Sequence, residues 1–235
     1  FEEAKKLNVP ADKLEAVRKE QVAAMADKII ALTFDDGPNT TTTVEVLEKL
    51  TKHGVTASFF VIGNNITEQS AAVMKRAYDM GCEIHNHSRS HPAMPELTAD
   101  EMTAEIAYTD TKVYEITGQH TRLFRPPYIA VNDLMFDTID LPFIAGIGCE
   151  DWLPEVTAQM RADKILAQAQ DGSIILMHDS EGNSQTVDAL DIIVPELKNR
   201  GFRFVTATEL FSEKGVQPSA SDKRVYSNAL QTTAY

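Results

Sequence analysis

Two adjacent carboxylates, Asp35 and Asp36, are the first residues in the chain whose types suggest chemistry. They follow a short apolar run and precede Gly37-Pro38, a pair that predicts a sharp turn exposing both side chains. Adjacent carboxylates repel, and each raises the pKa of the other unless a cation lies nearby. The pair therefore indicates either a cation site or an acidic turn of the common kind.

Imidazoles recur at His87 and His91, within the segment HSRSH. Side chains four residues apart share a helix face or converge in a tight loop, as metal ligands often do. Position 88 is Ser88, so the HExxH pattern of helical zinc sites is absent. His85 falls on the same side of an expected strand as His87, and we expect it to support the ligands rather than bind an ion. Two solvent-exposed histidines are the alternative.

One carboxylate and two imidazoles form a ligand set that leaves open positions for water. This set suits catalytic Zn²⁺ or Co²⁺, and it also suits non-haem Fe²⁺. Bound zinc lowers the pKa of water to about 7 and polarises a carbonyl. The second carboxylate of the pair is then free to act as a general base. The pattern predicts metal-dependent hydrolysis, with an iron oxygenase as the alternative class.

Three further charged residues stand at the ends of expected strands. His178 ends a fully apolar run and could protonate a leaving group. Such an acid must be cationic before the transfer, and Asp151 is the carboxylate proposed to keep it so. Arg125, in the segment RPPY, could hold Asp35 charged and oriented. Taken singly, each of these residues has the commoner explanation of a cap, a loop ion pair or a structural kink.

Short apolar runs alternate with helix-like segments along the chain. The expected strands are residues 29–34, 57–62, 83–86, 123–125, 143–147, 173–177 and 202–205. The expected helices are residues 42–53, 68–80, 98–117, 158–169 and 185–200. Alternating βα units imply parallel strands, whose C-terminal ends gather on one rim where sites are built. The pattern predicts an α/β fold whose seven parallel strands close, or nearly close, into a barrel.

The central part of the chain is expected to form one domain with two appendages. Residues 1–27 are charged and predict a helical appendage or linker, residues 28–212 the domain, and residues 213–235 a polar C-terminal extension. No stretch reaches the roughly 18 apolar residues that a membrane span needs. The net charge of −13 argues against nucleic acid or an anionic membrane as the main partner. Cys82 and Cys149 are interpreted as part-buried thiols.

The segments TFDDGP, HSRSH, RPPY, EDW and LMH, in this order, resemble the motifs of the polysaccharide deacetylase family, the fourth carbohydrate esterase family. The resemblance extends over roughly residues 28–212. It implies a distorted (β/α) barrel with fewer strands than the full form. It also implies hydrolysis of acetyl groups on sugars with one divalent metal ion, Zn²⁺ or Co²⁺.

The resemblance implies a role for each matching position. These positions are the metal ligands Asp36, His87 and His91, the base Asp35, the acid His178, the supporting residues Arg125 and Asp151, and the substrate-binding residues Pro126, Tyr128, Trp152 and Leu176. Tyr128 would offer its backbone N–H to the oxyanion. Trp152 and Leu176 would form an apolar wall around the acetyl methyl group.

Two positions depart from the pattern of many family members, Ile129 in place of glycine and Gly148 in place of aspartate. Both are expected to border the substrate groove. Residues 189–216 and 151–154 look most like clostridial acetyl xylan esterases, which predicts O-acetyl xylan as the substrate. Polymers of N-acetylglucosamine are the alternative substrate, and a carbohydrate-binding barrel without catalysis is the alternative function. Because polysaccharides lie outside the cell, we expect the protein to be secreted or held at the cell surface. We expect it to be a monomer.

Overall fold

The computed structural model describes residues 28–233, so the helix expected within residues 1–27 lies outside the described part. The strands of the described part are β1 (Lys28–Asp35), β2 (Ser58–Val61), β3 (Glu83–Asn86), β4 (Phe143–Ile144), β5 (Ile174–His178), β6 (Phe202–Val205) and β7 (Val225–Tyr226). The α-helices of this part are α3 (Thr42–His53), α4 (Glu68–Asp79), α5 (Ala99–Thr117), α6 (Asp133–Thr138), α7 (Ala158–Gln168), α8 (Ser184–Asn199) and α9 (Ala207–Glu213). Short 3-10 helices are η1 (Gly63–Asn65), η2 (Met94–Glu96), η3 (Pro127–Ile129) and η4 (Ala220–Asp222).

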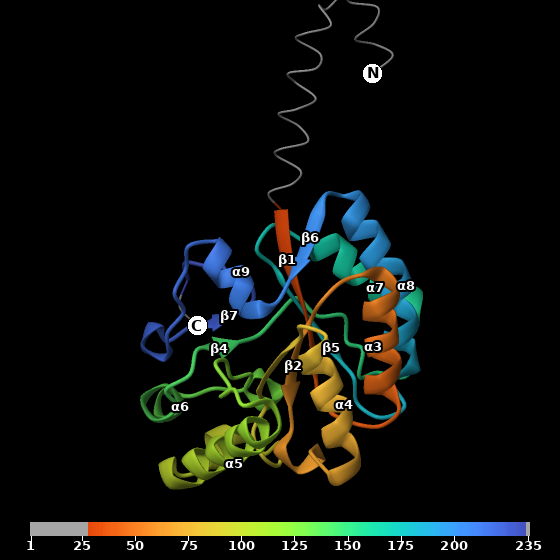
Figure 1. Ribbon diagram of the computed structural model, residues 1–235. Coiled ribbons are helices and arrows are strands. Elements are labelled where there is room, and N and C mark those ends of the chain that lie inside the picture. Colours follow the sequence, from red (N-terminus) through yellow and green to blue (C-terminus); the bar gives the residue numbers. More distant parts are fainter. Residues whose placement is uncertain (1–27, 234–235) are drawn as a thin grey trace, which may run out of the picture.

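The strands form a distorted parallel barrel, as the sequence predicts (Figure 1). One sheet has the order β3-β2-β1-β5, and β6 pairs with the first residues of β1. Isolated parallel bridges through Phe124 connect β3 to β4, and a bridge from Ile147 to Ile175 returns to β5. The ring of strands is therefore closed partly by single bridges rather than by full ladders.

The seven strands of the described residues are not the seven that the sequence pattern predicts. Residues 123–125 pair only through bridges at Phe124, because the segment is too short for a ladder. The additional strand is β7, which pairs in parallel with β4 and lies within the expected polar extension. Its residues Val225 and Tyr226 are buried, and so is the nearby Ala229. A two-residue apolar strand among polar neighbours has no periodicity that a sequence pattern can detect.

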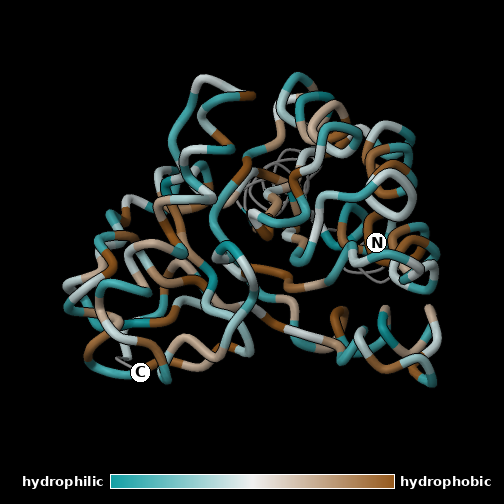
Figure 2. The backbone as a smooth tube through the Cα atoms, turned by 90° about the horizontal axis from the view of Figure 1, so that it is seen from below, coloured by the Kyte–Doolittle hydropathy of each residue, from teal (hydrophilic) through white to brown (hydrophobic). Residues whose placement is uncertain are grey.

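The helices cover the outside of the barrel. Helix α7 packs on α8, α8 on α3, α3 on α4, and α4 on α5, so that they form a continuous layer (Figure 1). Helix α5 begins at a capping box formed by Thr98 and Glu101, and it ends at Gly118 in the left-handed conformation. Figure 2 shows apolar and polar stretches alternating along the backbone.

Successive side chains of β1 alternate between the helix-covered face of the sheet and the barrel interior. Ile30, Leu32 and Phe34 pack in the core between the sheet and the helices. Ile29 and Ala31 belong to a second cluster, enclosed by the strands and α9. Because successive side chains of a strand point to opposite faces, Asp35 continues the inner set. The last residue of β1 therefore carries a carboxylate at the mouth of the barrel.

Candidate active site

The three residues with metal-ligand chemistry converge at the C-terminal ends of β1 and β3. One ligand atom from each of Asp36, His87 and His91 lies within 4.8 Å of the other two. Asp36 Oδ1 is 3.5 Å from His87 Nε2 and 3.7 Å from His91 Nε2. That oxygen is buried without a well-formed hydrogen bond, and such an atom costs about 1–3 kcal/mol unless something binds it. An orphaned anionic oxygen facing two imidazole nitrogens fits a divalent cation.

The electrostatics of the triad keep its members in the form that binds metal. Burial by itself would raise the pKa of Asp36, but the neighbouring histidines outweigh it and lower the pKa below its usual value. Burial lowers the pKa of His91, and the nearby His87 lowers it further. A carboxylate that stays charged and an imidazole that stays neutral are the states required of ligands.

His87 is oriented by the backbone of the RPPY segment. Its Nδ1 lies 2.7 Å from the carbonyl oxygen of Arg125, which can only accept, so Nδ1 carries the proton. The lone pair of Nε2 is then directed toward Asp36 and His91. Such a bond from the second ring nitrogen fixes the tautomer of a metal-ligating histidine.

Several site residues have a left-handed backbone, which costs non-glycine residues about 1–3 kcal/mol each. The φ angles are 77° at Asp36, 58° at His91 and 59° at Tyr128. The amide of Asn65 donates to the carbonyl oxygen of Asp36 at 2.7 Å and helps to hold that turn. Two of the three triad residues, Asp36 and His91, thus have backbone conformations that the surrounding loops must enforce.

Asp179 supports the turn from below, although no role is predicted for it from the sequence, where it directly follows His178. It is completely buried, and it accepts hydrogen bonds from the backbone N–H of Gly37 at 3.1 Å and the hydroxyl of Thr43 at 2.5 Å. Its own backbone N–H donates to the carbonyl oxygen of Asp35 at 3.0 Å. Burial raises the pKa of Asp179 to about 7. The sequence feature that could have indicated a role for Asp179 is its position directly after an apolar strand.

Asp35 is fixed by a buried ion pair on one side and faces the triad on the other. Arg125 Nη1 donates to Asp35 Oδ1 at 2.5 Å, and Nη2 donates to the carbonyl oxygen of Ala145 at 2.7 Å. The guanidinium is fully buried and lies 4.1 Å from the ring centre of Phe60. Asp35 Oδ2 is 3.8 Å from His87 Nε2. One carboxylate oxygen of Asp35 is bound by Arg125, and the other faces His87 of the triad.

His178 lies beside Asp35 on the rim, because the two residues are register partners in β5 and β1. Its Nδ1 is 2.7 Å from Asp151 Oδ1, and its backbone N–H donates to Oδ2 at 2.7 Å. Burial would lower the pKa of His178, but the hydrogen bond and charge of Asp151 outweigh it and raise the pKa to about 9. The imidazole is therefore cationic at neutral pH.

Two exposed aromatic side chains flank this centre. Tyr128 is 70% exposed, with its ring 4.7 Å from that of His91. Trp152 is 59% exposed and contacts the ring of His178 edge-on at 5.6 Å. Leu176 is buried, as is Pro126 before η3. The predicted substrate-binding residues thus divide into two exposed rings and two buried apolar groups.

A groove of about 600 Å³ adjoins the triad. Asp36 and His91 line it together with residues of η1 and the start of α4. Its walls carry amide side chains from Asn64, Asn65 and Gln69. Such groups both donate and accept hydrogen bonds, as sugar hydroxyls require.

His85 is the sequence-predicted residue that the structure places away from the triad. Its Nε2 lies 3.1 Å from Glu83, and its ring packs against Phe60. The reason is that His85 is still within β3 and faces the barrel interior, whereas His87 lies beyond the end of the strand. The expectation that His85 supports the ligands is therefore wrong.

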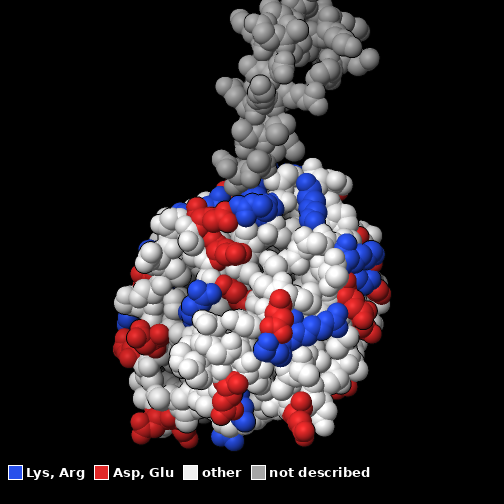
Figure 3. Space-filling view, viewed as in Figure 1, with Lys and Arg blue, Asp and Glu red and all other residues white. Residues whose placement is uncertain are grey.

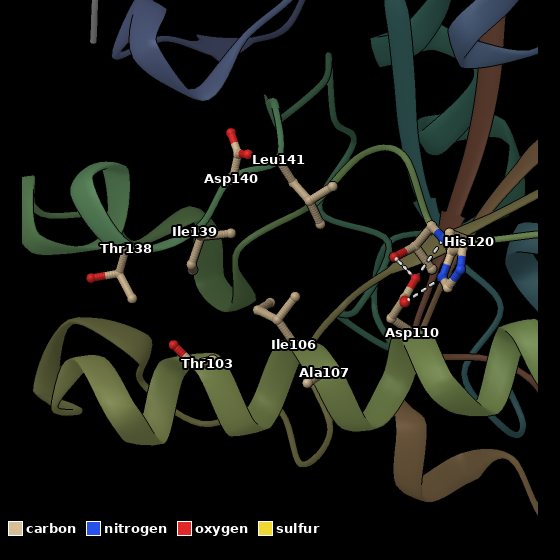
Figure 4. A pocket seen from close by; sticks show the side chains of 10 residues that line it. Thr103, Ile106, Ala107, Asp110, His120, Thr138, Ile139, Asp140 and Leu141 are labelled. Carbon is tan, nitrogen blue, oxygen red and sulfur yellow. Dashed lines mark hydrogen bonds and ion pairs between the residues drawn. The ribbon is translucent and has the colours of Figure 1, made fainter.

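A second hollow, of about 310 Å³, lies between α5 and the segment that follows α6 (Figure 4). Its wall is mainly apolar, with Ile106, Ile139 and Leu141, and an ion pair between Asp110 and His120 stands at one end. Within residues 28–233, the groups with metal-ligand geometry are confined to the triad and do not reach this hollow. The chemistry is thus concentrated at the rim of the barrel.

The sequence and the structure both match known proteins. Residues 23–140 match the family model described as polysaccharide deacetylase. A bifunctional xylanase/deacetylase of Pseudobutyrivibrio xylanivorans is 46% identical over 86% of this chain and 33% of its own length. A peptidoglycan-N-acetylglucosamine deacetylase of Listeria monocytogenes is 39% identical over 81% of this chain and 40% of its own length. The chain therefore spans only about a third to two fifths of these curated relatives.

Among solved structures, a family 4 acetyl xylan esterase from Clostridium thermocellum, in complex with a cobalt ion, has a TM-score of 0.85. It is 41% identical, and the match covers 87% of this chain and all of the other. The resemblance inferred from the motifs is thereby confirmed, together with the distorted barrel. The chain belongs to the polysaccharide deacetylase family, whose members are carbohydrate deacetylases and esterases.

Proposed function

We propose that this chain hydrolyses O-acetyl groups on xylan, with one divalent ion, Zn²⁺ or Co²⁺, bound by Asp36, His87 and His91. The observation that carries the proposal is the arrangement of two further groups beside the triad. Asp35 directs an oxygen toward it, and His178 is the register partner of Asp35 on the next strand. A base and an acid on either side of a cation site suit hydrolysis of an ester.

Asp35 is the proposed base. A divalent cation in this site would lower the pKa of a water molecule and polarise the acetyl carbonyl. Asp35 Oδ2 faces the site, whereas Oδ1 is held by Arg125. The carboxylate therefore accepts the proton of the attacking water at Oδ2, and Arg125 keeps it from rotating away.

His178 is the proposed acid. Its Nδ1 is engaged by Asp151, so the proton that can be transferred is the one on Nε2. With a pKa raised to about 9, the imidazolium is present before the reaction begins. It donates that proton to the departing sugar oxygen, and acetate is released.

The remaining predicted residues bind the acetyl group. The backbone N–H of Tyr128 is proposed to donate to the oxyanion, and removing one such donor typically costs about 10²–10³ in kcat. Trp152, Leu176 and Pro126 would enclose the methyl group, whose burial contributes about 0.8 kcal/mol. These contacts favour an acetyl group over a smaller acyl group.

A neutral polysaccharide suits the groove and the surface. The groove presents amides, and acidic and basic side chains are interspersed on the face seen in Figure 3. The similarity to an acetyl xylan esterase and to a xylanase/deacetylase supports xylan as the polymer. The Listeria relative supports a second candidate, N-deacetylation of N-acetylglucosamine polymers. No described helix has the length and hydropathy of a membrane span. Because polysaccharides lie outside the cell, we propose that the protein acts there, as a monomer.

Acetate release tests the proposal. The metal-stripped protein is reloaded with Zn²⁺ or Co²⁺ and assayed on acetylated xylan and on N-acetylglucosamine oligomers, with Asp35→Asn as the control. Release from xylan alone, and only with metal, is the expected result. Release only from the amino sugars would select the second candidate. Absence of release from both would contradict both and favour a carbohydrate-binding barrel.

A further inference from the structure

Arg161, on α7, is a buried cation that belongs neither to the triad nor to the residues in direct contact with it. Its side chain is 1% exposed, and within the described residues no carboxylate lies at ion-pair distance from it. The guanidinium instead donates to Val156 O at 2.7 Å and to Leu153 O at 3.3 Å. A buried charge without a direct counter-ion is expensive, which calls for an explanation.

Nη1 of Arg161 is connected to Asp151 by hydrogen bonds through two side chains. It donates to Thr186 Oγ1 at 2.8 Å and to Asn183 Oδ1 at 2.5 Å. Thr186 Oγ1 lies 2.7 Å from Asp151 Oδ2, and Asn183 Nδ2 lies 3.4 Å from the same oxygen. Asn183 Nδ2 also donates to the carbonyl oxygen of His178 at 3.0 Å. Arg161 is thus one side chain removed from the carboxylate that holds the acid.

The direction of these hydrogen bonds follows from the chemistry of arginine. A guanidinium only donates, so the hydroxyl oxygen of Thr186 accepts and its own proton must point to Asp151. In the same way, the amide oxygen of Asn183 accepts from Arg161, which turns the amide nitrogen toward Asp151 and His178. One cation therefore sets both neighbours as donors to a single carboxylate.

The consequence for Asp151 is that its anionic form is stabilised at both oxygens. Oδ1 faces His178 Nδ1, while Oδ2 receives the backbone N–H of His178 and the hydroxyl of Thr186. An acceptor satisfied in this way does not take the proton from Nδ1. Asp35, Asp36 and His91 also interact electrostatically with His178.

We propose that Arg161, acting through Thr186 and Asn183, is a positioning residue that keeps Asp151 an oriented anion and so keeps His178 protonated at Nε2 for transfer to the leaving group. The inference rests on the proposed function, because it concerns the acid step of that reaction. The competing explanation is structural: Arg161 could simply fasten α7 to the start of α8.

Thr186→Val removes the hydroxyl with little change in shape and separates the two explanations. It is assayed on acetylated xylan, whose sugar leaving group needs a proton, and on 4-nitrophenyl acetate, whose leaving group does not. We expect kcat to fall at least about tenfold on xylan and less than about threefold on the nitrophenyl ester, in keeping with loss of acid catalysis alone. KM for xylan should stay the same, and the alkaline limb of the kcat/KM profile should move to lower pH. Thr186→Ser, which keeps a hydroxyl, should show the kcat and the pH profile of the wild type.

Thr121→Val is the matched control, because Thr121 is buried and its hydroxyl also donates to a carboxylate, that of Asp110, at 2.8 Å. Thr121→Val should lower the melting temperature without changing kcat on xylan relative to kcat on 4-nitrophenyl acetate. Arg161→Gln, which keeps a donor but removes the charge, should act in the same direction as Thr186→Val. The double variant should lose less than the sum of the two, since coupled residues are not additive.

An NMR titration of the His178 imidazole in the Zn²⁺-loaded protein tests the inference independently of any polysaccharide. A lower pKa of His178 in Thr186→Val supports it. An unchanged pKa, or equal losses on both substrates, would assign Arg161 a structural role. Failure of the wild type on acetylated xylan, with the titration as expected, would refute the proposed substrate and leave the positioning role standing.

Discussion

At the scale of single residues, two neighbouring aspartates take different positions because their backbones differ. Asp35 is the last residue of an extended strand and points to the barrel interior, where Arg125 binds it. Asp36 would point to the opposite face if the strand continued. Its φ angle of 77° instead turns the side chain toward His87 and His91. The change of backbone conformation brings two adjacent carboxylates to one site.

Asp35→Asn should abolish turnover while the metal stays bound. The amide still accepts from Arg125 but cannot take a proton, so we expect kcat to fall by about 10²–10⁴, the usual contribution of a general base. Metal content after dialysis should remain at the wild-type level, because Asp35 is outside the triad. Wild-type turnover would contradict the assignment, and loss of metal would make Asp35 a ligand.

Asp151→Asn should move the alkaline limit of activity to lower pH. The pKa of His178 is raised to about 9 with Asp151 in place, so the protonated acid persists up to about that pH. Without the carboxylate, burial dominates and lowers the pKa, by about 1–3 units if the lost charge is a close partner. A kcat/KM profile from pH 5 to 10 measures the shift. A profile that coincides with wild type would remove Asp151 from this role.

At the scale of elements, the turn after β1 depends on a close approach to β5. A Cβ on Gly37 would collide with the carboxylate of Asp179, which is buried directly behind it. Glycine is needed here for the space it leaves. The turn that carries Asp36 is therefore built by two strands that are distant in sequence.

Gly37→Ala should weaken metal binding and stability together. Forcing a methyl group against Asp179 costs about 1–3 kcal/mol, and each kcal/mol lowers Tm by roughly 2–4 °C in a protein of this size. Gly148→Ala is the matched control, because an added Cβ there meets nothing within 4 Å. Thermal unfolding and metal content measure both effects. Equal behaviour of the two variants would show that the close approach is unimportant.

At the scale of the whole molecule, the side chains of Asp36, His87 and His91 are held by the fold, so the protein should remain folded without metal. His87 is fixed by Arg125 O, and Asp36 by Asn65 and by the turn over Asp179. The apolar cluster that contains Ile29 and Ala31, near the start of β1, also includes Tyr226 of β7. The rim itself is thus preorganised.

Metal removal should lower stability in a pH-dependent way. An ion present at a thousand times its Kd raises the free energy of unfolding by about 4 kcal/mol, which corresponds to a rise of roughly 8–16 °C in Tm. Because burial lowers the pKa of His91, this ligand stays neutral and competent at pH 7. As the pH falls and protons displace the ion, the difference between metal-loaded and stripped protein should disappear. Thermal unfolding from pH 5 to 8 measures it, and a constant difference at pH 5 would exclude histidine ligands.

Much of this architecture follows from the sequence alone. The apolar runs and the capping box of Thr98 determine where strands and helices begin, since these signals depend on neighbours along the chain. Reactive residues placed after successive parallel strands must share one rim, which predicts the triad, Asp35 and His178 as neighbours. The ordered motifs then identify the family.

Only the tertiary structure decides the features that depend on contacts between distant segments. It brings His85 within hydrogen-bond distance of Glu83 and pairs β7 with β4. It also buries Asp179 against Gly37. It also connects Arg161 to Asp151 through side chains of the next helix. Periodicity reports which face of an element is buried, but not which partner lies against that face. The choice of partner is made by packing and by the need of every buried polar group for a hydrogen bond.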